Sequence, residues 1–96
     1  MTKKEKETIY EEVDSSIREI YSDRDVDEVK SDIESMFGEM EFVDEKIDDG
    51  CDDDEDDNYV MMRSYDFSYK GVDFYIRLYY GDCTGLVGSY DLEIDD

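Results

Sequence analysis

Two runs of alternating apolar residues on either side of Lys70-Gly71 restrict the fold of this chain more than any other feature. A two-residue turn at this point places three residue pairs on one face of a hairpin, all of them apolar: Tyr69 with Val72, Phe67 with Phe74, and Tyr65 with Ile76. A half-buried antiparallel sheet requires such an apolar face. The pattern therefore predicts strands over residues 59–69 and 72–80.

Two further strands are expected around this hairpin. Alternation at Met40 and Phe42 indicates a short first strand, and residues 86–94 form the last one after a Gly-rich turn. The last strand is predicted to face inward through Leu86, Tyr90, Leu92 and Ile94. The opposite face of the sheet is expected to show a mixed set of side chains: Val60, Met62, Asp66, Asp73, Tyr75, Arg77, Tyr79, Val87, Asp91, Glu93 and Asp95.

Two amphipathic helices are predicted before the strands. A capping-box pattern followed by apolar residues three and four apart predicts a helix over residues 3–21. A second cap at Asp25 starts a helix over residues 26–37, which Gly38 ends. Packing both helices on one face of a three- to four-stranded antiparallel meander gives a single α+β domain spanning 1–96.

The net charge is extreme for a domain of this size. Thirty-one acidic and ten basic side chains give a formal charge of −21, and the resulting self-repulsion opposes folding. The chain is nevertheless 39% hydrophobic with nine tyrosines, which indicates a folded domain rather than a disordered one. Direct binding to nucleic acid is excluded by the sign of the charge, since such binding depends on Lys and Arg.

The composition disfavours most catalytic and metal chemistry. There is no His, and Cys51 and Cys83 lack the spacing of a metal site, so no cofactor and no metal site are expected. Paired carboxylates have no diagnostic value where acids are this frequent, and an enzyme is not expected. No secretory signal or apolar stretch of about 20 residues is seen, which predicts a cytoplasmic protein without membrane contact.

The densest acidic segment, residues 48–58, contains eight carboxylates in eleven positions. Calcium binding is the first alternative, because clustered carboxylates bind hard cations. An EF-hand centred on Gly50 places Ile47 at a ligand position and Asp56 where the bidentate Glu belongs. A specific calcium site is therefore disfavoured, and a mobile acidic loop is expected.

Acids are also expected on the folded elements. Two like-charge pairs four residues apart lie on the outward faces of the helices, each costing about 0.2–0.5 kcal/mol: Glu7 with Glu11, and Glu28 with Asp32. Residues two apart on a strand, such as Asp91, Glu93 and Asp95, lie about 7 Å from one another. A DNA strand advances about 3.4 Å per phosphate along its axis, and its helical path makes the phosphate spacing longer. Such rows of acids approximate rows of phosphates.

In these respects, as in "YEEVDSSIREI" and "YDLEIDD", the chain resembles the small acidic DNA-mimic inhibitors encoded by bacteriophages and mobile elements, including anti-restriction and anti-CRISPR proteins. The resemblance implies a non-catalytic inhibitor that occupies the Lys/Arg-lined nucleic-acid site of a host defence nuclease or CRISPR effector. The predicted contact surface comprises Asp48, Asp49, Asp52, Asp53, Asp54, Glu55, Asp56, Asp57, Glu7, Glu11, Glu28, Asp32, Tyr75, Tyr79, Asp91, Glu93 and Asp95.

Three alternatives remain open. An immunity protein or antitoxin that neutralises a basic toxin would use the same electrostatics. An interaction module would instead depend on Tyr75 and Tyr79, because tyrosine is enriched at interface hot spots. An acidic surface also arises from adaptation to high salt or from selection for solubility.

Overall fold

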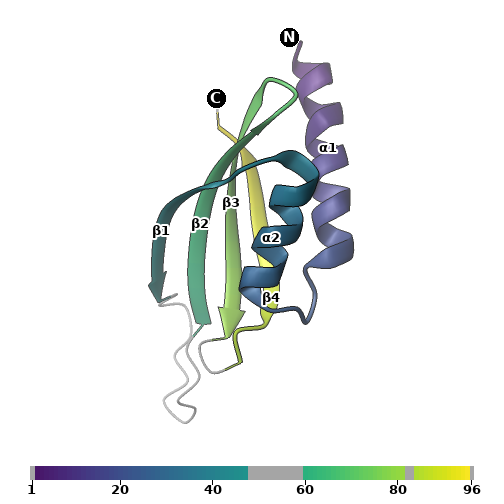
Figure 1. Cartoon of the computed structure of the whole chain (residues 1–96). Coiled ribbons are helices and arrows are strands. Elements are labelled where there is room, and N and C mark those ends of the chain that lie inside the picture. The colour runs from purple at the N-terminus through teal and green to yellow at the C-terminus, as the bar shows by residue number, and fades with distance from the viewer. Residues whose placement is uncertain (1, 48–59, 82–83, 96) are drawn as a thin grey trace.

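The computed structural model describes residues 2–47, 60–81 and 84–95. Within these ranges, two N-terminal helices precede a four-stranded antiparallel sheet, as the sequence predicts (Figure 1). The elements are α1 (Lys3–Ile20), α2 (Val26–Phe37), β1 (Glu41–Ile47), β2 (Val60–Tyr69), β3 (Val72–Gly81) and β4 (Val87–Ile94).

Side-chain caps fix the starts of both helices. The Thr2 hydroxyl accepts a hydrogen bond from the Glu5 N–H at 3.2 Å, and the Asp25 carboxylate accepts one from the Asp27 N–H at 2.9 Å. At the end of α2, Gly38 has a φ of 109°, a backbone conformation that side-chain-bearing residues rarely adopt. The helices begin and end where the sequence predicts, except that α1 ends at Ile20, one residue before the predicted end at Tyr21.

The central hairpin has the predicted register. Tyr69 pairs with Val72, and the next inward pairs follow in step: Phe67 with Phe74, and Tyr65 with Ile76. Both turn residues, Lys70 and Gly71, have positive φ angles of 51° and 81°, as a type I′ turn requires. The strands lie in the order β1-β2-β3-β4, so each pairs with its neighbour in sequence.

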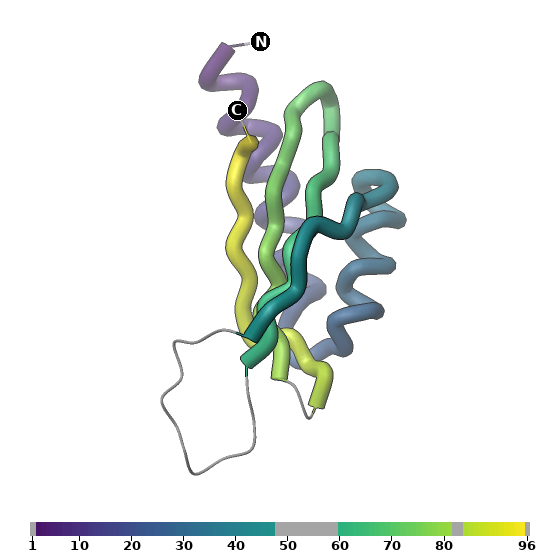
Figure 2. Tube along the Cα trace, turned by 90° about the vertical axis from the view of Figure 1, so that its left-hand side faces the viewer, coloured from purple at the N-terminus to yellow at the C-terminus, as the bar shows by residue number. Residues whose placement is uncertain are grey.

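Both helices cover the same face of the sheet (Figures 1 and 2). The core between the two layers contains fully buried side chains from both helices and from the sheet, including Ile17, Ile33, Phe74 and Leu78. Two tyrosines fasten α1 to β4 through their hydroxyls: Tyr10 donates to the Leu92 carbonyl at 2.9 Å, and Tyr90 donates to the Asp14 carboxylate at 2.5 Å. The opposite side, hereafter the outer face, carries none of the described helices.

The last strand corrects one part of the predicted inner face. Val87 is fully buried, whereas Leu86 is 42% exposed, so these two residues exchange the roles expected of them. The reason is a β-bulge: Tyr80 pairs with Val87 while Tyr79 pairs with Ser89, which leaves Gly88 without a partner in the ladder. One extra residue reverses the alternation on its N-terminal side.

The first strand also differs from its prediction. Met40 precedes β1 and is buried, whereas Phe42, within the strand, is 61% exposed. All seven residues of β1 are exposed, because the helices do not extend over this edge of the sheet. Phe42 still faces the inner side, where its ring meets that of Tyr65 edge-on with centroids 6.0 Å apart.

Candidate interaction surface

The outer face presents its side chains in rows that cross the strands. One row runs from Glu41 on β1 through Asp66 and Tyr75 to Glu93 on β4, each residue directly opposite the next. The Asp95 N–H donates to the carbonyl of Asp73 at 2.9 Å, which places both residues beyond this row, near the β2–β3 turn. Three carboxylates thus share one row, and two more follow it.

Five carboxylates surround a shallow hollow at this end of the outer face. The hollow has a volume of about 550 Å³, and we call its acids the acidic end: Glu39, Glu41, Asp66, Asp73 and Asp95. No ion pair between described residues involves any of the five. Burial raises the pKa of Asp66, and the negative charges of Asp95, Glu41 and Asp73 raise it further. Negative charge is concentrated here without an internal cation.

The predicted residues of β3 and β4 occupy the adjoining part of the outer face. Asp91 and Glu93 are exposed and lie 3.9 and 3.8 Å from the guanidinium of Arg77. Arg77 in turn lies over the ring of Tyr75, 4.8 Å from its centroid. Tyr75 and Tyr79 face the same side but are only half-buried rather than fully exposed. Part of the negative charge of Asp91 and Glu93 is therefore already neutralised by Arg77 within the sheet.

The predicted helix acids divide into two groups. Glu7 and Glu11 are exposed on α1 and belong to none of the ion pairs between described residues. Glu28 and Asp32 both contact Arg24, with a distance of 3.7 Å for Glu28. The α2 pair is thus arranged around a cation, which reduces its likeness to two successive phosphates.

The predicted residues of the acidic segment, and the calcium alternative with it, lie outside the described residues: Asp48, Asp49, Asp52, Asp53, Asp54, Glu55, Asp56 and Asp57. In the part of the chain that the structure describes, no group of three or more Cys, Asp or Glu side chains is arranged to hold a metal ion.

Four acids of the acidic end were not among the predicted contact residues: Glu39, Glu41, Asp66 and Asp73. Asp66 and Asp73 were placed on the outer face by strand alternation, which was the available signal. Glu41 becomes their neighbour only through the pairing of β1 with β2, and these strands are joined by the long segment 48–59. Alternation within one strand contains no information about that register.

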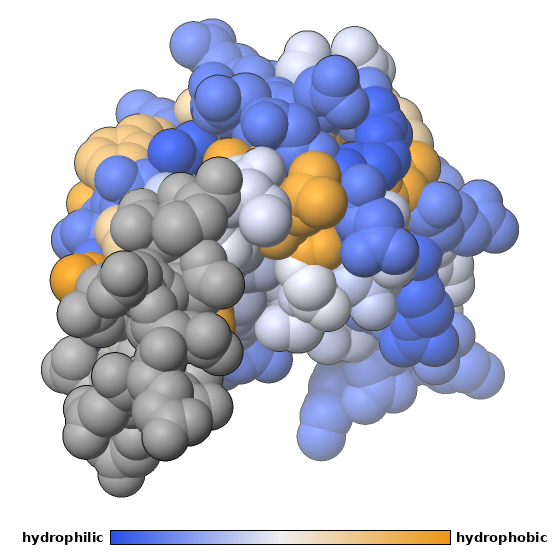
Figure 3. Space-filling view, turned by 90° about the horizontal axis from the view of Figure 1, so that it is seen from below, coloured by the Kyte–Doolittle hydropathy of each residue, from blue (hydrophilic) through white to orange (hydrophobic). Residues whose placement is uncertain are grey.

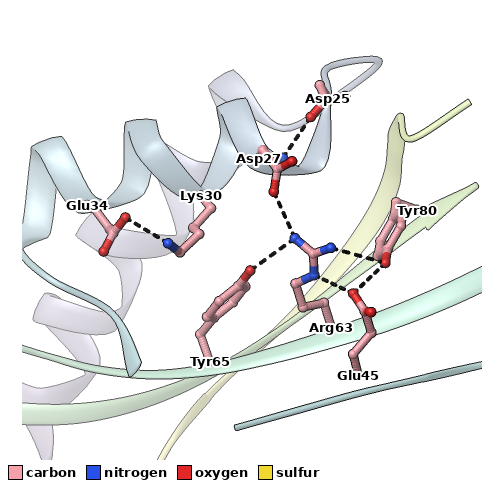
Figure 4. A network of polar contacts seen from close by, with 8 residues as sticks. All are labelled: Asp25, Asp27, Lys30, Glu34, Glu45, Arg63, Tyr65 and Tyr80. Atoms are coloured by element: carbon pink, nitrogen blue, oxygen red, sulfur yellow. Dashed lines mark hydrogen bonds and ion pairs between the residues drawn. The ribbon is translucent and has the colours of Figure 1, made fainter. Parts of the chain in front are cut away.

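A polar cluster on the inner face joins β1, β2 and α2 around Arg63 (Figure 4). Its guanidinium donates to Glu45 at 2.5 Å and to Asp27 at 2.9 Å, with longer contacts to the hydroxyls of Tyr65 and Tyr80 at 3.3 and 3.4 Å. The Tyr80 hydroxyl donates to Glu45 at 2.6 Å. Arg63 is only partly exposed, and its contacts connect the edge strand β1 and helix α2 to the rest of the sheet.

The pKa values in this cluster follow from the same contacts. The Tyr80 hydroxyl and then Arg63 hold the pKa of Glu45 below its usual range. Burial acts to lower the pKa of Arg63, but hydrogen bonds with Tyr65, Glu45 and Asp27 outweigh it and raise the pKa above its ordinary value. Glu45 and Arg63 therefore both remain ionised at neutral pH, as in a structural ion-pair cluster.

Apolar surface is limited at the opposite end of the sheet, where β3 ends. Figure 3 shows mostly hydrophilic side chains there, with small separate apolar patches among them. The exposed apolar side chains of the described residues include Ile47 and Leu86, at 47% and 42% exposure. Neither described helix combines the length and the apolar character needed to cross a bilayer.

No protein-family model, curated protein or solved structure matches this chain. The arguments for function therefore depend on the surface geometry and charge described above.

Proposed function

We propose that this protein is a non-catalytic nucleic-acid mimic, which inhibits a nucleic-acid-binding protein by occupying its Lys/Arg-lined site. The target class is a host defence nuclease or CRISPR effector, in keeping with the acidic inhibitors that the sequence resembles. Inhibition is competitive, because the acidic surface and the nucleic acid occupy the same positive groove.

One observation supports this proposal above the others: most of the positive charge is already paired within the protein. At least six of the ten basic side chains form ion pairs with carboxylates of the described residues: Arg18, Arg24, Lys30, Arg63, Lys70 and Arg77. The formal charge of −21 is therefore presented by surfaces such as the acidic end, where ion pairs between described residues are absent. Solubility needs a net charge of only about 2–8 in magnitude.

Rigid positioning of the acids gives a second reason. Acids on neighbouring strands are roughly 5 Å apart and those two residues apart on one strand roughly 7 Å. These spacings span the distance between successive phosphates of a nucleic-acid strand. A groove that neutralises phosphates with Lys and Arg meets similar charges at similar intervals on this sheet.

The test begins with immobilised full-length protein in a bacterial lysate at low salt. Proteins eluted by a salt gradient are identified by mass spectrometry and purified, and their binding to a fluorescent duplex is measured as this protein is added. The proposal predicts a rising apparent Kd for the duplex with an unchanged signal at saturation. It also predicts that added salt releases the complex, through the counterion effect that governs phosphate contacts.

Poly-L-glutamate at matched charge concentration is the control, and it should compete much more weakly because its carboxylates are not held in place. Inhibition that is noncompetitive with the duplex, or that salt leaves unchanged, contradicts the proposal. A captured protein that binds duplex and this protein at the same time also contradicts it.

A further inference from the structure

We infer that β1 is a docking strand. An extended segment of the partner, in which apolar residues alternate with Lys or Arg, adds to the free edge of β1, the side away from β2. The inference rests on the proposed function only for the positive charge of the partner. It goes beyond charge, because strand addition is held by backbone hydrogen bonds and by side-chain packing on one face.

The two edges of the sheet differ in how their backbone groups are paired. At the β4 edge, the connection between the helices pairs with the start of the strand: the Asp23 N–H donates to the Val87 carbonyl at 3.1 Å, and the Val87 N–H donates to the Arg24 carbonyl at 2.8 Å. Further along, the Tyr10 hydroxyl donates to the Leu92 carbonyl at 2.9 Å. The chain's own groups thus occupy much of the β4 edge.

The β1 edge has backbone groups without a neighbouring strand. Asp73 directs its carbonyl toward β4, so its partner on β2, Ser68, directs its backbone groups toward β1. Asp66, two residues earlier, does the same, and Glu41 lies opposite it. Because these directions alternate along a strand, the next residue, Phe42, directs its N–H and carbonyl toward the free edge.

Beyond the β-bulge of β1 the same alternation continues. Lys46 lies opposite Met62, whose backbone groups point toward β1. The residues on either side of Lys46, Glu45 and Ile47, therefore direct theirs toward the free edge. The Asp44 carboxylate accepts a hydrogen bond from the Glu45 N–H at 2.8 Å. The Glu45 carbonyl and the Ile47 N–H have no strand beside them in the described part of the chain, because β1 is the last strand on this side.

Exposed apolar surface is concentrated on the same strand. Three of the five large apolar side chains that are exposed in the described ranges belong to β1: Phe42 at 61%, Val43 at 45% and Ile47 at 47%. Phe42 lies on the inner face against Tyr65, and Ile47 lies on that face opposite Met61. Neither helix extends over this strand (Figure 1). An added strand covers this apolar surface with its own apolar side chains, which favours binding.

Charge identifies the occupant as a basic segment. Glu41 and Asp44 are exposed on β1, whose one basic residue is Lys46. A second copy of this chain brings another charge of −21 to the edge, so repulsion opposes self-pairing. A segment that alternates apolar and basic residues suits both faces of the edge. Its apolar side chains meet Phe42 and Ile47 on the inner face, and its basic side chains lie beside Glu41 on the outer face.

The test adds a short peptide of alternating valine and lysine to the full chain at physiological salt. Its control is the same peptide with N-methylated backbone amides, which keeps the charge but cannot donate to a strand. Titration calorimetry should show at least about tenfold weaker binding of the control, since it loses several hydrogen bonds of ordinary strength. Amide hydrogen exchange, followed by NMR, should slow at Phe42 and Ile47 in the complex and stay unchanged along β4.

Matched variants separate this edge from other apolar surface. Phe42→Ala and Ile47→Ala each remove an exposed side chain of β1, and Leu86→Ala removes one of similar exposure elsewhere. Each β1 variant is expected to bind the alternating peptide about fivefold more weakly, through the apolar contact that it loses. Leu86→Ala should change the affinity by less than about twofold. The amide spectrum of each variant verifies its fold.

Equal affinity for the N-methylated peptide, absence of binding by the alternating peptide, or slowed exchange on β4 in place of β1 overturns the inference. A dimer of the free protein in sedimentation, with protected Phe42 and Ile47 amides, also overturns it, since a second copy then occupies the edge.

The protein captured from the lysate separates the two proposals. If the Phe42→Ala/Ile47→Ala variant competes with the duplex as strongly as the parent protein, the inferred edge is wrong and the proposed function stands. If the alternating peptide adds to β1 but no captured protein shows competition, the proposed function is wrong and the docking strand stands.

Discussion

Replacement of Arg63 by Met tests the structural role of the polar cluster on the inner face. Met retains most of the volume of the side chain, so the change reports mainly on polar contacts. The strongest is the contact with Glu45, whose side chain is 33% exposed, while Asp27 is 78% exposed and contributes little. The two long hydroxyl contacts and the packing of the guanidinium over Tyr80 at 5.2 Å add smaller amounts.

Together these contacts predict a loss of about 2 kcal/mol in the free energy of unfolding, below the cost of breaking a fully buried ion pair. For a domain of this size the melting temperature should fall by roughly 10 °C. Urea unfolding and thermal unfolding, both followed by circular dichroism, measure the effect. The difference from the parent protein should narrow below about pH 4, because a carboxylate with a lowered pKa stabilises the fold only while it is ionised.

Arg77→Met is the matched control, since it removes the same charge from the outer face. Its carboxylate contacts of 3.8 and 3.9 Å are long and solvated, and its packing over the Tyr75 ring at 4.8 Å resembles that of Arg63 over Tyr80, so a loss of at most about 1 kcal/mol is expected. Equal losses for Arg63→Met and Arg77→Met would show that net charge, rather than the inner-face cluster, determines the effect. A loss below about 0.5 kcal/mol for Arg63→Met would refute the reasoning outright.

Three other perturbations have defined outcomes. Asp66→Asn should stabilise the fold at neutral pH by about 0.5 kcal/mol in urea unfolding. Because the pKa of Asp66 is raised in the folded state, this gain should shrink as the pH falls through that pKa. It should vanish below about pH 3.9, the ordinary pKa of an aspartate, where the carboxyl is protonated in the folded and the unfolded state alike. Ser64→Ala should stabilise the fold by about 1 kcal/mol, since it removes a buried hydroxyl that has no hydrogen-bond partner among the described residues, whereas destabilisation would indicate an ordered water or another partner. Raising sodium chloride from low to physiological concentration should raise the melting temperature of the parent protein, because screening reduces the repulsion within a chain of charge −21, and a falling melting temperature would contradict this.

Local patterns in the sequence determined most of the fold. The helices follow from apolar periodicity with caps at Thr2 and Asp25, which act within one turn. The central hairpin follows from the Lys70-Gly71 turn, because a two-residue turn fixes the register of the strands that it joins. Net charge also followed from the sequence alone, and with it the prediction that the protein does not bind nucleic acid directly.

Only the tertiary structure decided which acids gather on one surface and which are paired internally. Glu41 meets Asp66 through β1–β2 pairing, whose register is set by packing and not by a short turn. Arg63 finds its carboxylates 18 and 36 residues away in the chain, and the bulge at Gly88 reverses the expected roles of Leu86 and Val87. Short-range pattern specifies which face a side chain occupies within its own element, whereas its charged neighbours depend on contacts between distant elements.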